Sequence, residues 1–465
     1  MRTGGHMRER ELIVYRVFRD GGLLHDMARL MAFCGGETSR REKGVFSGEE
    51  GVYTTEAAGN PSVEEDMSEL FYGCIHRLIE LAGTYGFHGN LWHCYLTHLL
   101  VNHENSYSRG CEMRGEIEGT LNEAVLHDIR IFLEFFRYDF TPMCRRLHEA
   151  EFSLVENYIS SRLESRVYNT RIRDRICELA CRLGGSREPG EMKAALTEFY
   201  KEYGVGKFGL HKSFRIARDG DGETCGDVRI EPIPNIAHVK FSDLVGYEGA
   251  KKKLADNTDA FVEGRPANNC LLFGDAGTGK SSCIKALANE YYNRGLRVIE
   301  VYKHQFRDLS RVIGQIKDRN YKFIIFMDDL SFEDFETEYK YLKAVIEGGL
   351  EKKPDNVLIY ATSNRRHLIR ENYSDKEAVR QDMHTGDTVQ EKLSLAYRFG
   401  VTIYFGAPDM KQFRAIVKAL AERGGMAISE EELFARANQW ELSHGGLSGR
   451  TARQFIDYLS GERGD

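Results

Sequence analysis

Eight residues near the middle of the chain, GDAGTGKS (274–281), constrain its fold more than any other segment. They lie between an apolar extended segment, NNCLLF (268–273), and a segment with helical spacing, SSCIKALANEYYNRG (281–295). Glycine at 274 and 279, followed by lysine and serine, is the spacing of a phosphate-binding loop. Such a loop requires a strand that ends at a sheet edge and a helix that begins there, which favours an α/β fold.

The segments after Pro234 alternate between extended and helical patterns, which predicts a parallel five-stranded sheet with flanking helices over residues 236–405. From about residue 406 only helical periodicity remains, and this predicts a small α-helical lid over 406–465. The expected strands lie within NNCLLF (268–273), LRVIEVY (296–302), YKFIIFMDD (321–329), NVLIYATSN (356–364) and VTIYF (401–405).

The first 235 residues have a different pattern of apolar residues, which predicts a separate, mainly helical N-terminal domain. Apolar residues recur at helical spacing from about 7 to 205, and the glycine- and charge-rich stretch 35–61 has no period, as expected of a flexible connection. Two short extended pieces within 207–234 predict a small hairpin, which we assign to this domain.

The net charge of −7 and the isoelectric point near 6.2 argue against a surface built as a whole to bind nucleic acid. An arginine-rich stretch, 161–187, is either a solvated helix face or a local basic face for nucleic acid or an acidic partner. No apolar run approaches the roughly 20 residues needed to span a bilayer, and no secretory signal is present. We therefore expect a cytoplasmic protein without a membrane partner.

The glycine-rich loop predicts a site for ATP and Mg²⁺. Glycines let the backbone turn tightly and aim N–H groups at phosphates, Lys280 adds a positive charge at the β- and γ-phosphates, and Ser281 offers its hydroxyl group to the metal. The expected nucleotide-binding residues here are Gly274, Asp275, Ala276, Gly277, Thr278, Gly279, Lys280, Ser281 and Ser282.

A second motif, FIIFMDD (323–329), ends an apolar and therefore buried strand with two carboxylates. Ligands bind at this edge of a parallel sheet, so Asp328 is the expected partner of Mg²⁺ beside Ser281. Asp329 follows at the place for a general base that polarises the attacking water. Two alternatives remain: Glu333 as the base, or Asp329 as a cap of the following segment.

From about 245 to 455 the chain resembles an AAA+ module and, more narrowly, the uncharacterised bacterial ATP-binding family catalogued as domain of unknown function number 815. The residues that carry the resemblance are FSDLVGYEGAKKKLADNTDAFVEG (241–264), the phosphate loop, FIIFMDDLSFE (323–333), YKYLKAVIEGGLEKKPDNVLIYATSNRRHL (339–368), EKLSLAYRFG (391–400) and GLSGRTARQF (446–455). Over the N-terminal 200 residues the resemblance is faint.

The resemblance implies further site residues. Val245, Gly246 and Tyr247 look like the stretch that packs on adenine, and Asn364 resembles the polar sensor that holds the attacking water. Arg398 resembles the arginine finger given to a neighbouring subunit's ATP. In the same way, Arg450 resembles the lid arginine that contacts the γ-phosphate, with Arg453 as an alternative.

The implied function is ATP hydrolysis at the interfaces of a homo-oligomer that remodels or loads a macromolecular client through its N-terminal domain. Two departures matter. Many related ATPases carry glutamate where this chain has Asp329, and 302–312 lacks the aromatic–hydrophobic–glycine pore loop of protein-threading machines. An ATP-gated binding module with incidental hydrolysis therefore remains an alternative, as does phosphate transfer to another acceptor.

Overall fold

The computed structural model describes residues 8–35, 61–147, 152–160, 167–168, 170–218, 228–332, 338–347, 354–364, 368 and 395–462. Apart from its two end residues, the predicted connection 35–61 lies outside this set, as does Glu333. The chain forms two compact units, Met1–Leu210 and His211–Asp465. None of the described helices combines the length and the apolar character that a bilayer-spanning segment requires.

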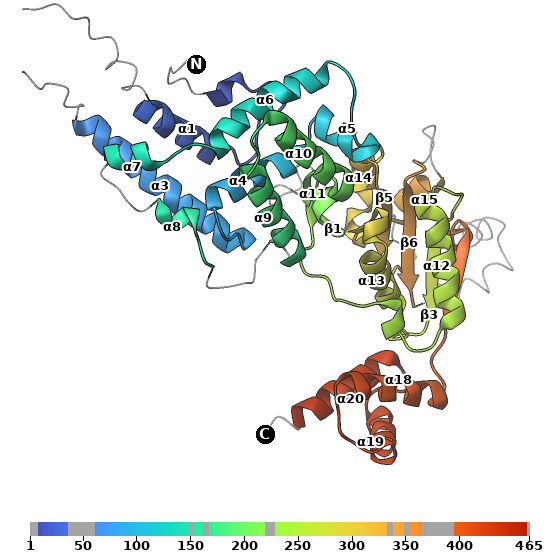
Figure 1. Cartoon of the computed structure of the whole chain (residues 1–465). Coiled ribbons are helices and arrows are strands. Elements are labelled where there is room, and N and C mark those ends of the chain that lie inside the picture. Colours follow the sequence, from blue (N-terminus) through green and yellow to red (C-terminus); the bar gives the residue numbers. More distant parts are fainter. Residues whose placement is uncertain are drawn as a thin grey trace, which may run out of the picture. The chain divides into compact units, whose positions relative to one another are not determined.

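The first unit is helical in its described part, as the periodicity predicts (Figure 1). Helix α6 illustrates why, because apolar residues three or four apart, such as Val125, Ile129 and Phe132, share one buried face. Its helices are α1 (Gly22–Gly35), α3 (Pro61–Tyr85), α4 (Leu91–Asn102), α5 (Ser106–Arg114), α6 (Leu121–Phe136), α7 (Thr141–Leu147), α8 (Ser153–Glu156), α9 (Thr170–Gly184), α10 (Pro189–Tyr203) and α11 (Gly206–Leu210), with a 3₁₀ turn η1 (Arg8–Glu11).

Several described arginines of the stretch 161–187 contact neighbours within the first unit. Arg173 is buried and its guanidinium group pairs with Asp174 at 2.6 Å. The guanidinium group of Arg175 lies over the ring of Tyr203, 3.9 Å from its centroid, and Arg182 forms an ion pair with Glu198. Arg173 is thus held inside the unit, whereas the side chain of Arg182 stays more than half exposed.

The second unit is built on a seven-stranded sheet with the order β2-β1-β4-β5-β6-β3-β7. The strands are β1 (Ser213–Arg218), β2 (Val228–Pro232), β3 (Cys270–Gly274), β4 (Leu296–Glu300), β5 (Lys322–Met327), β6 (Val357–Ser363) and β7 (Val401–Phe405). All five predicted parallel strands are present, which confirms the α/β fold class.

The predicted hairpin forms, but its assignment to the N-terminal domain and the count of five strands are wrong. β1 and β2 pair in antiparallel fashion, and β1 also pairs in parallel with β4, for example Phe214 with Ile299. The hairpin thus extends the sheet and belongs to the second unit, which begins at His211 rather than at 236. The reason is that apolar residues of β1, such as Phe214 and Ile216, are buried against this unit.

The centre of the sheet is buried on both faces. In β5 the consecutive residues Phe323, Ile324, Ile325, Phe326 and Met327 are all buried, as expected of a parallel strand covered on each side. Helices α12 (Glu248–Val262) and α13 (Lys280–Glu290) pack their apolar faces into one core cluster with the sheet. The other helices of this region are α14 (Leu309–Ile316) and α15 (Glu338–Glu347), with 3₁₀ turns η2 (Phe241–Asp243), η3 (Tyr292–Arg294) and η4 (Lys303–Asp308).

The last three helices form the expected lid, coloured red in Figure 1, around an apolar cluster of their own. They are α18 (Met410–Arg423), α19 (Glu430–Ser443) and α20 (Gly449–Glu462). Local sequence sets where they begin, because the side chains of Asp409 and Ser429 accept hydrogen bonds from backbone N–H groups in the first turns of α18 and α19. Phe413, Phe455 and Leu459 fill the centre of the cluster.

Candidate nucleotide-binding site

The glycine-rich loop connects β3 to α13 and depends on backbone conformations that favour glycine. Gly274 has φ +134°, and a Cβ atom there would lie 2.1 Å from the carbonyl oxygen of Phe405 on β7. Gly277 and Gly279 also have positive φ, and Gly279 directly precedes α13. The N-terminus of α13, with its unpaired N–H groups, therefore faces the loop and favours an anion there.

Lys280 is the first residue of α13 and is only 6% exposed. Its ammonium group donates to the carbonyl oxygens of Gly274 at 2.9 Å and Asp275 at 2.6 Å, and to Oδ1 of Asn364 at 3.0 Å. Burial lowers the pKa of Lys280, and the carboxylates of Asp275, Asp329 and Asp328 oppose that shift. The positive charge is thus held at the loop, within reach of a bound phosphate.

A hydroxyl–carboxylate pair lies beside the loop, as expected of a magnesium site. Ser281 Oγ donates to Asp328 Oδ1 at 2.6 Å, and Thr362 Oγ1 donates to the same oxygen at 2.5 Å. Oxygen atoms of this kind are the ligands that Mg²⁺ prefers, and it is normally held by one or two carboxylates together with phosphates and waters. The residues present therefore fit the ion.

Asp329 follows in an unusual backbone conformation, with φ +50°, which residues other than glycine rarely adopt. Its N–H group donates to Thr362 Oγ1 at 2.9 Å, and its Oδ1 accepts from Asn364 Nδ2 at 2.7 Å. Asn364 therefore bridges the lysine of the loop and this carboxylate. The sequence-based expectation that Asn364 and Asp329 act near the same phosphate is compatible with this contact.

These groups line one cavity of about 690 Å³, within the range of ligand pockets in proteins. We call the part at the loop the phosphate end. The remainder, the base end, is lined by apolar side chains from two places in the chain, Leu244, Val245 and Tyr247 before α12 and Ile416 and Leu420 on α18. Leu244 packs against the core cluster of the sheet, whereas Val245 packs against the cluster of the lid.

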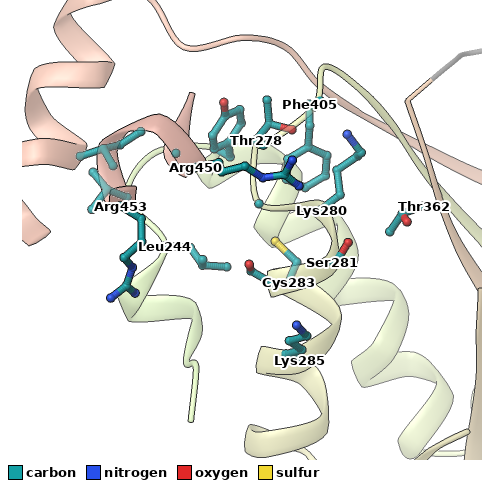
Figure 2. A pocket seen from close by; sticks show the side chains of 18 of the residues that line it. Leu244, Thr278, Lys280, Ser281, Cys283, Lys285, Thr362, Phe405, Arg450 and Arg453 are labelled. Atoms are coloured by element: carbon teal, nitrogen blue, oxygen red, sulfur yellow. The ribbon is translucent and has the colours of Figure 1, made fainter. Parts of the chain in front are cut away.

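Two lid arginines lie at different ends of the cavity. The N–H group of Arg450 donates to the carbonyl oxygen of Gly277 at 3.3 Å, so α20 begins against the loop. Figure 2 shows the side chain of Arg450 pointing toward Lys280, whereas that of Arg453 points away from the loop, past Leu244. Of the two candidates for the phosphate contact, the geometry favours Arg450.

Most of the expected site residues line the cavity, and four do not: Gly246, Gly274, Asp275 and Arg398. Gly274 packs against β7, and the Asp275 carboxylate accepts from the N–H group of Ala407 at 2.7 Å, so both shape the loop. Arg398 forms an ion pair with Glu347. The expected residues that line the cavity are Val245, Tyr247, Ala276, Gly277, Thr278, Gly279, Lys280, Ser281, Ser282, Asp328, Asp329, Asn364 and Arg450.

Sequence reasoning missed Thr362 and the lid residues Ile416 and Leu420. The sequence could have identified Thr362, because it is a polar residue within a strand, VLIYATS, that is buried along its whole length. Nothing in the sequence distinguishes the two lid residues, since an apolar residue on an amphipathic helix is expected to pack in the core. Cys283 and Lys285, further along α13, also line the cavity.

The mostly parallel sheet, the phosphate loop after β3, the acidic pair after β5 and the helical lid define an AAA+ ATPase. The chain belongs to the family described as "Protein of unknown function (DUF815)", which it matches over residues 221–463, slightly more than half of its length. The resemblance drawn from the motifs is thereby confirmed.

Similar proteins include the replication factor C large subunit of Staphylothermus marinus, which is 36% identical over 77 residues, or 16% of this chain and 18% of that protein. A putative 26S proteasome regulatory subunit homologue of Methanocaldococcus jannaschii is 30% identical over 146 residues, 27% of this chain and 39% of that one. The chain thus covers less than two thirds of these relatives. The structure of the Thermotoga maritima RuvB Holliday junction branch migration motor aligns with a TM-score of 0.31 and 14% identity, over 47% of this chain and 72% of that one.

Proposed function

We propose that the protein binds Mg·ATP in this cavity and hydrolyses it at the interfaces of a homo-oligomer, to remodel or load a macromolecular client. One observation carries the proposal: the lysine of the loop, the Ser281–Asp328 pair and the Asn364–Asp329 pair line the same cavity. A phosphate-binding loop alone would serve many enzymes. The paired acidic and amide groups are what hydrolysis requires in addition.

Each side chain has a task that its position supports. The ammonium group of Lys280 and the N-terminus of α13 offset the negative charge of the β- and γ-phosphates. Ser281 and Asp328 would hold Mg²⁺, which would supply positive charge beside the phosphate oxygens. Asp329 accepts a proton from the attacking water, and Asn364 orients that water as well as the carboxylate.

Arg398 completes this proposal from outside the cavity. Its side chain is 22% exposed, pairs with Glu347 and does not line the cavity of its own chain. An arginine finger given to a neighbour has to be near the surface, and it stabilises charge in the transition state by a factor on the order of 10³–10⁵ in rate. Assembly should therefore raise turnover, and the client would be bound by another surface, such as the first unit.

The test is hydrolysis and binding measured on the purified full chain. Lys280→Ala should abolish ATP binding at micromolar ATP, whereas Lys252→Ala, which removes an exposed lysine of α12, should leave binding and turnover unchanged. Arg398→Ala should retain binding but lose turnover and the dependence of turnover on protein concentration. ATP binding by Lys280→Ala at the parent affinity would overturn the proposal.

A second candidate, a nucleotide-gated binding module with slow turnover, is favoured by the geometry of Asp329. Aspartate is one methylene shorter than glutamate, and one of its carboxylate oxygens is already held by Asn364 at 2.7 Å. Asp329→Glu separates the two candidates. A gain in turnover of about ten-fold or more would favour a restrained switch, since a well-placed general base is worth roughly 10²–10⁴ in rate. A loss would favour a motor tuned to aspartate.

A further inference from the structure

Strand β6 brings Thr362 to the end of β5, where the two acidic residues lie. The register pairs Met327 with Ala361, so Thr362 is the next residue of β6 and lies beside Asp328. On its other side Thr362 pairs with Leu272 of β3, and it is only 1% exposed. It nevertheless lines the cavity, across from the phosphate loop (Figure 2).

Three hydrogen bonds connect Thr362 to the three residues that follow β5. Its hydroxyl group donates to Asp328 Oδ1 at 2.5 Å and accepts from the N–H group of Asp329 at 2.9 Å. Its carbonyl oxygen accepts from the N–H group of Leu330 at 2.7 Å. Because a hydroxyl group has one proton, the donor direction is fixed, and the N–H group of Asp329 polarises the bond to Asp328.

The hydroxyl group thereby acts on both acidic residues. Asp328 Oδ1 also accepts from Ser281, but Ser281 belongs to the phosphate loop and its oxygen would itself be a ligand of the metal. The bond from Thr362 does not depend on the loop. At the same time, the bond from the N–H group of Asp329 holds this residue at φ +50°, a strained conformation that persists only where its surroundings enforce it.

We propose that Thr362 is the positioning residue of this site: its hydroxyl group fixes the Asp328 carboxylate for the magnesium ion and holds the turn that carries Asp329. The proposal rests on the proposed function, because it assigns Asp328 to the metal. It goes further in separating two contributions to ATP binding. Thr362 acts only on the part that depends on magnesium, and the phosphate loop supplies the part that does not.

The experiment is calorimetric titration of the full chain with ATP, in excess Mg²⁺ and in EDTA. Thr362→Val removes the hydroxyl group at nearly constant shape. It should weaken binding in Mg²⁺ by roughly ten- to hundred-fold, the usual effect of losing a group that orients a metal ligand, and leave the dissociation constant in EDTA unchanged. Thr362→Ser, which keeps the hydroxyl group, should restore most of the loss.

Thr258→Val is the matched control. Thr258 is fully buried in the same unit, and its hydroxyl group contacts the carbonyl oxygen of Leu254 and the hydroxyl group of Tyr360, away from the cavity. It should lower stability without changing the ratio of the two dissociation constants. If Thr362→Val does not fold, as judged by circular dichroism against this control, Thr362→Ala replaces it.

Two failures remain distinguishable. If Thr362→Val, or Thr362→Ala in its place, keeps the parent's ratio of dissociation constants, or weakens binding equally in Mg²⁺ and EDTA, Thr362 is not the positioning residue, while binding that depends on Lys280 still supports the proposed function. If Lys280→Ala binds ATP like the parent, the proposed function itself fails.

Discussion

The two ends of the cavity are built in different ways. The phosphate end is made of backbone and short polar contacts at one edge of the sheet, where hydrogen bonds of 3.0 Å or less join Lys280 to Asn364, Asn364 to Asp329, and Ser281 to Asp328. The base end is made of apolar surface that comes from the segment before α12 and from the lid. A buried hydrogen-bond network is disrupted when a single atom is added or removed. The free energy of apolar contact, by contrast, falls only in proportion to the buried area that is lost.

The largest effect expected from this comparison comes from a single methyl group at the phosphate end. In Gly274→Ala the new Cβ would lie 2.1 Å from the carbonyl oxygen of Phe405, so the loop or β7 has to move. We expect a loss of about 3 kcal/mol of unfolding free energy, and no measurable ATP binding. Urea denaturation and calorimetry measure both.

Gly295→Ala is the control for that variant. Gly295 also has positive φ, +86°, but no neighbouring atom lies within 4 Å of the place that a Cβ would take, so backbone strain alone applies, roughly 1–2 kcal/mol. ATP binding should be retained. Equal losses of stability in Gly274→Ala and Gly295→Ala would mean that the loop relaxes around the new methyl group. The phosphate end would then not be more rigid than the base end.

A smaller effect is expected at the base end from Arg423→Ala. Arg423, at the end of α18, donates to the carbonyl oxygens of Asp243 at 2.7 Å and Ser242 at 2.8 Å, and so connects the lid to the segment that carries Leu244 and Val245. Loss of these partly exposed contacts should weaken ATP binding by roughly three- to ten-fold, measured by calorimetry. A complete loss of binding would break the comparison, since the base end would then be as intolerant as the phosphate end.

Arg436→Ala is the matched control within the lid. Arg436 of α19 pairs with Glu462 of α20, an exposed ion pair that does not reach the sheet or the cavity. Such pairs contribute little to stability, and ATP affinity should stay at the parent value. A similar loss in both variants would attribute the effect of Arg423 to the stability of the lid rather than to its contact with residues 242 and 243.

The sequence predicts the phosphate end better than the base end for a physical reason. The loop and Asp328 follow from local spacing and from strands whose ends meet at one sheet edge. Asn364 follows from the resemblance to AAA+ modules. The pairing of β1 with β4, by contrast, joins residues about 85 apart in the chain, such as Phe214 and Ile299, and no local pattern specifies it. No local pattern identifies Ile416 and Leu420 as cavity residues either, because only the position of the lid decides that they line the cavity.

Near neutral pH, the smallest effect is a difference in pH dependence between the two ends. Burial lowers the pKa of Lys280 below its ordinary value, and a bound triphosphate would favour the ammonium form and raise the pKa again. Below the lowered pKa, Lys280 is charged with or without ATP, and affinity is constant. Above it, binding must take up a proton, so the dissociation constant rises, by at most ten-fold per pH unit. Calorimetry in two buffers of different ionisation enthalpy measures the proton directly.

Adenosine, which has no phosphate, probes the base end alone and is the control for that pH series. Burial raises the pKa of Tyr247 to about 12, so its hydroxyl group stays neutral below about pH 10 and adenosine affinity should stay flat there. ATP affinity should fall over the range in which Lys280 loses its proton, because only the phosphate end contains this charge. A parallel decline for ATP and adenosine would mean that the charge at Lys280 does not distinguish the two ends.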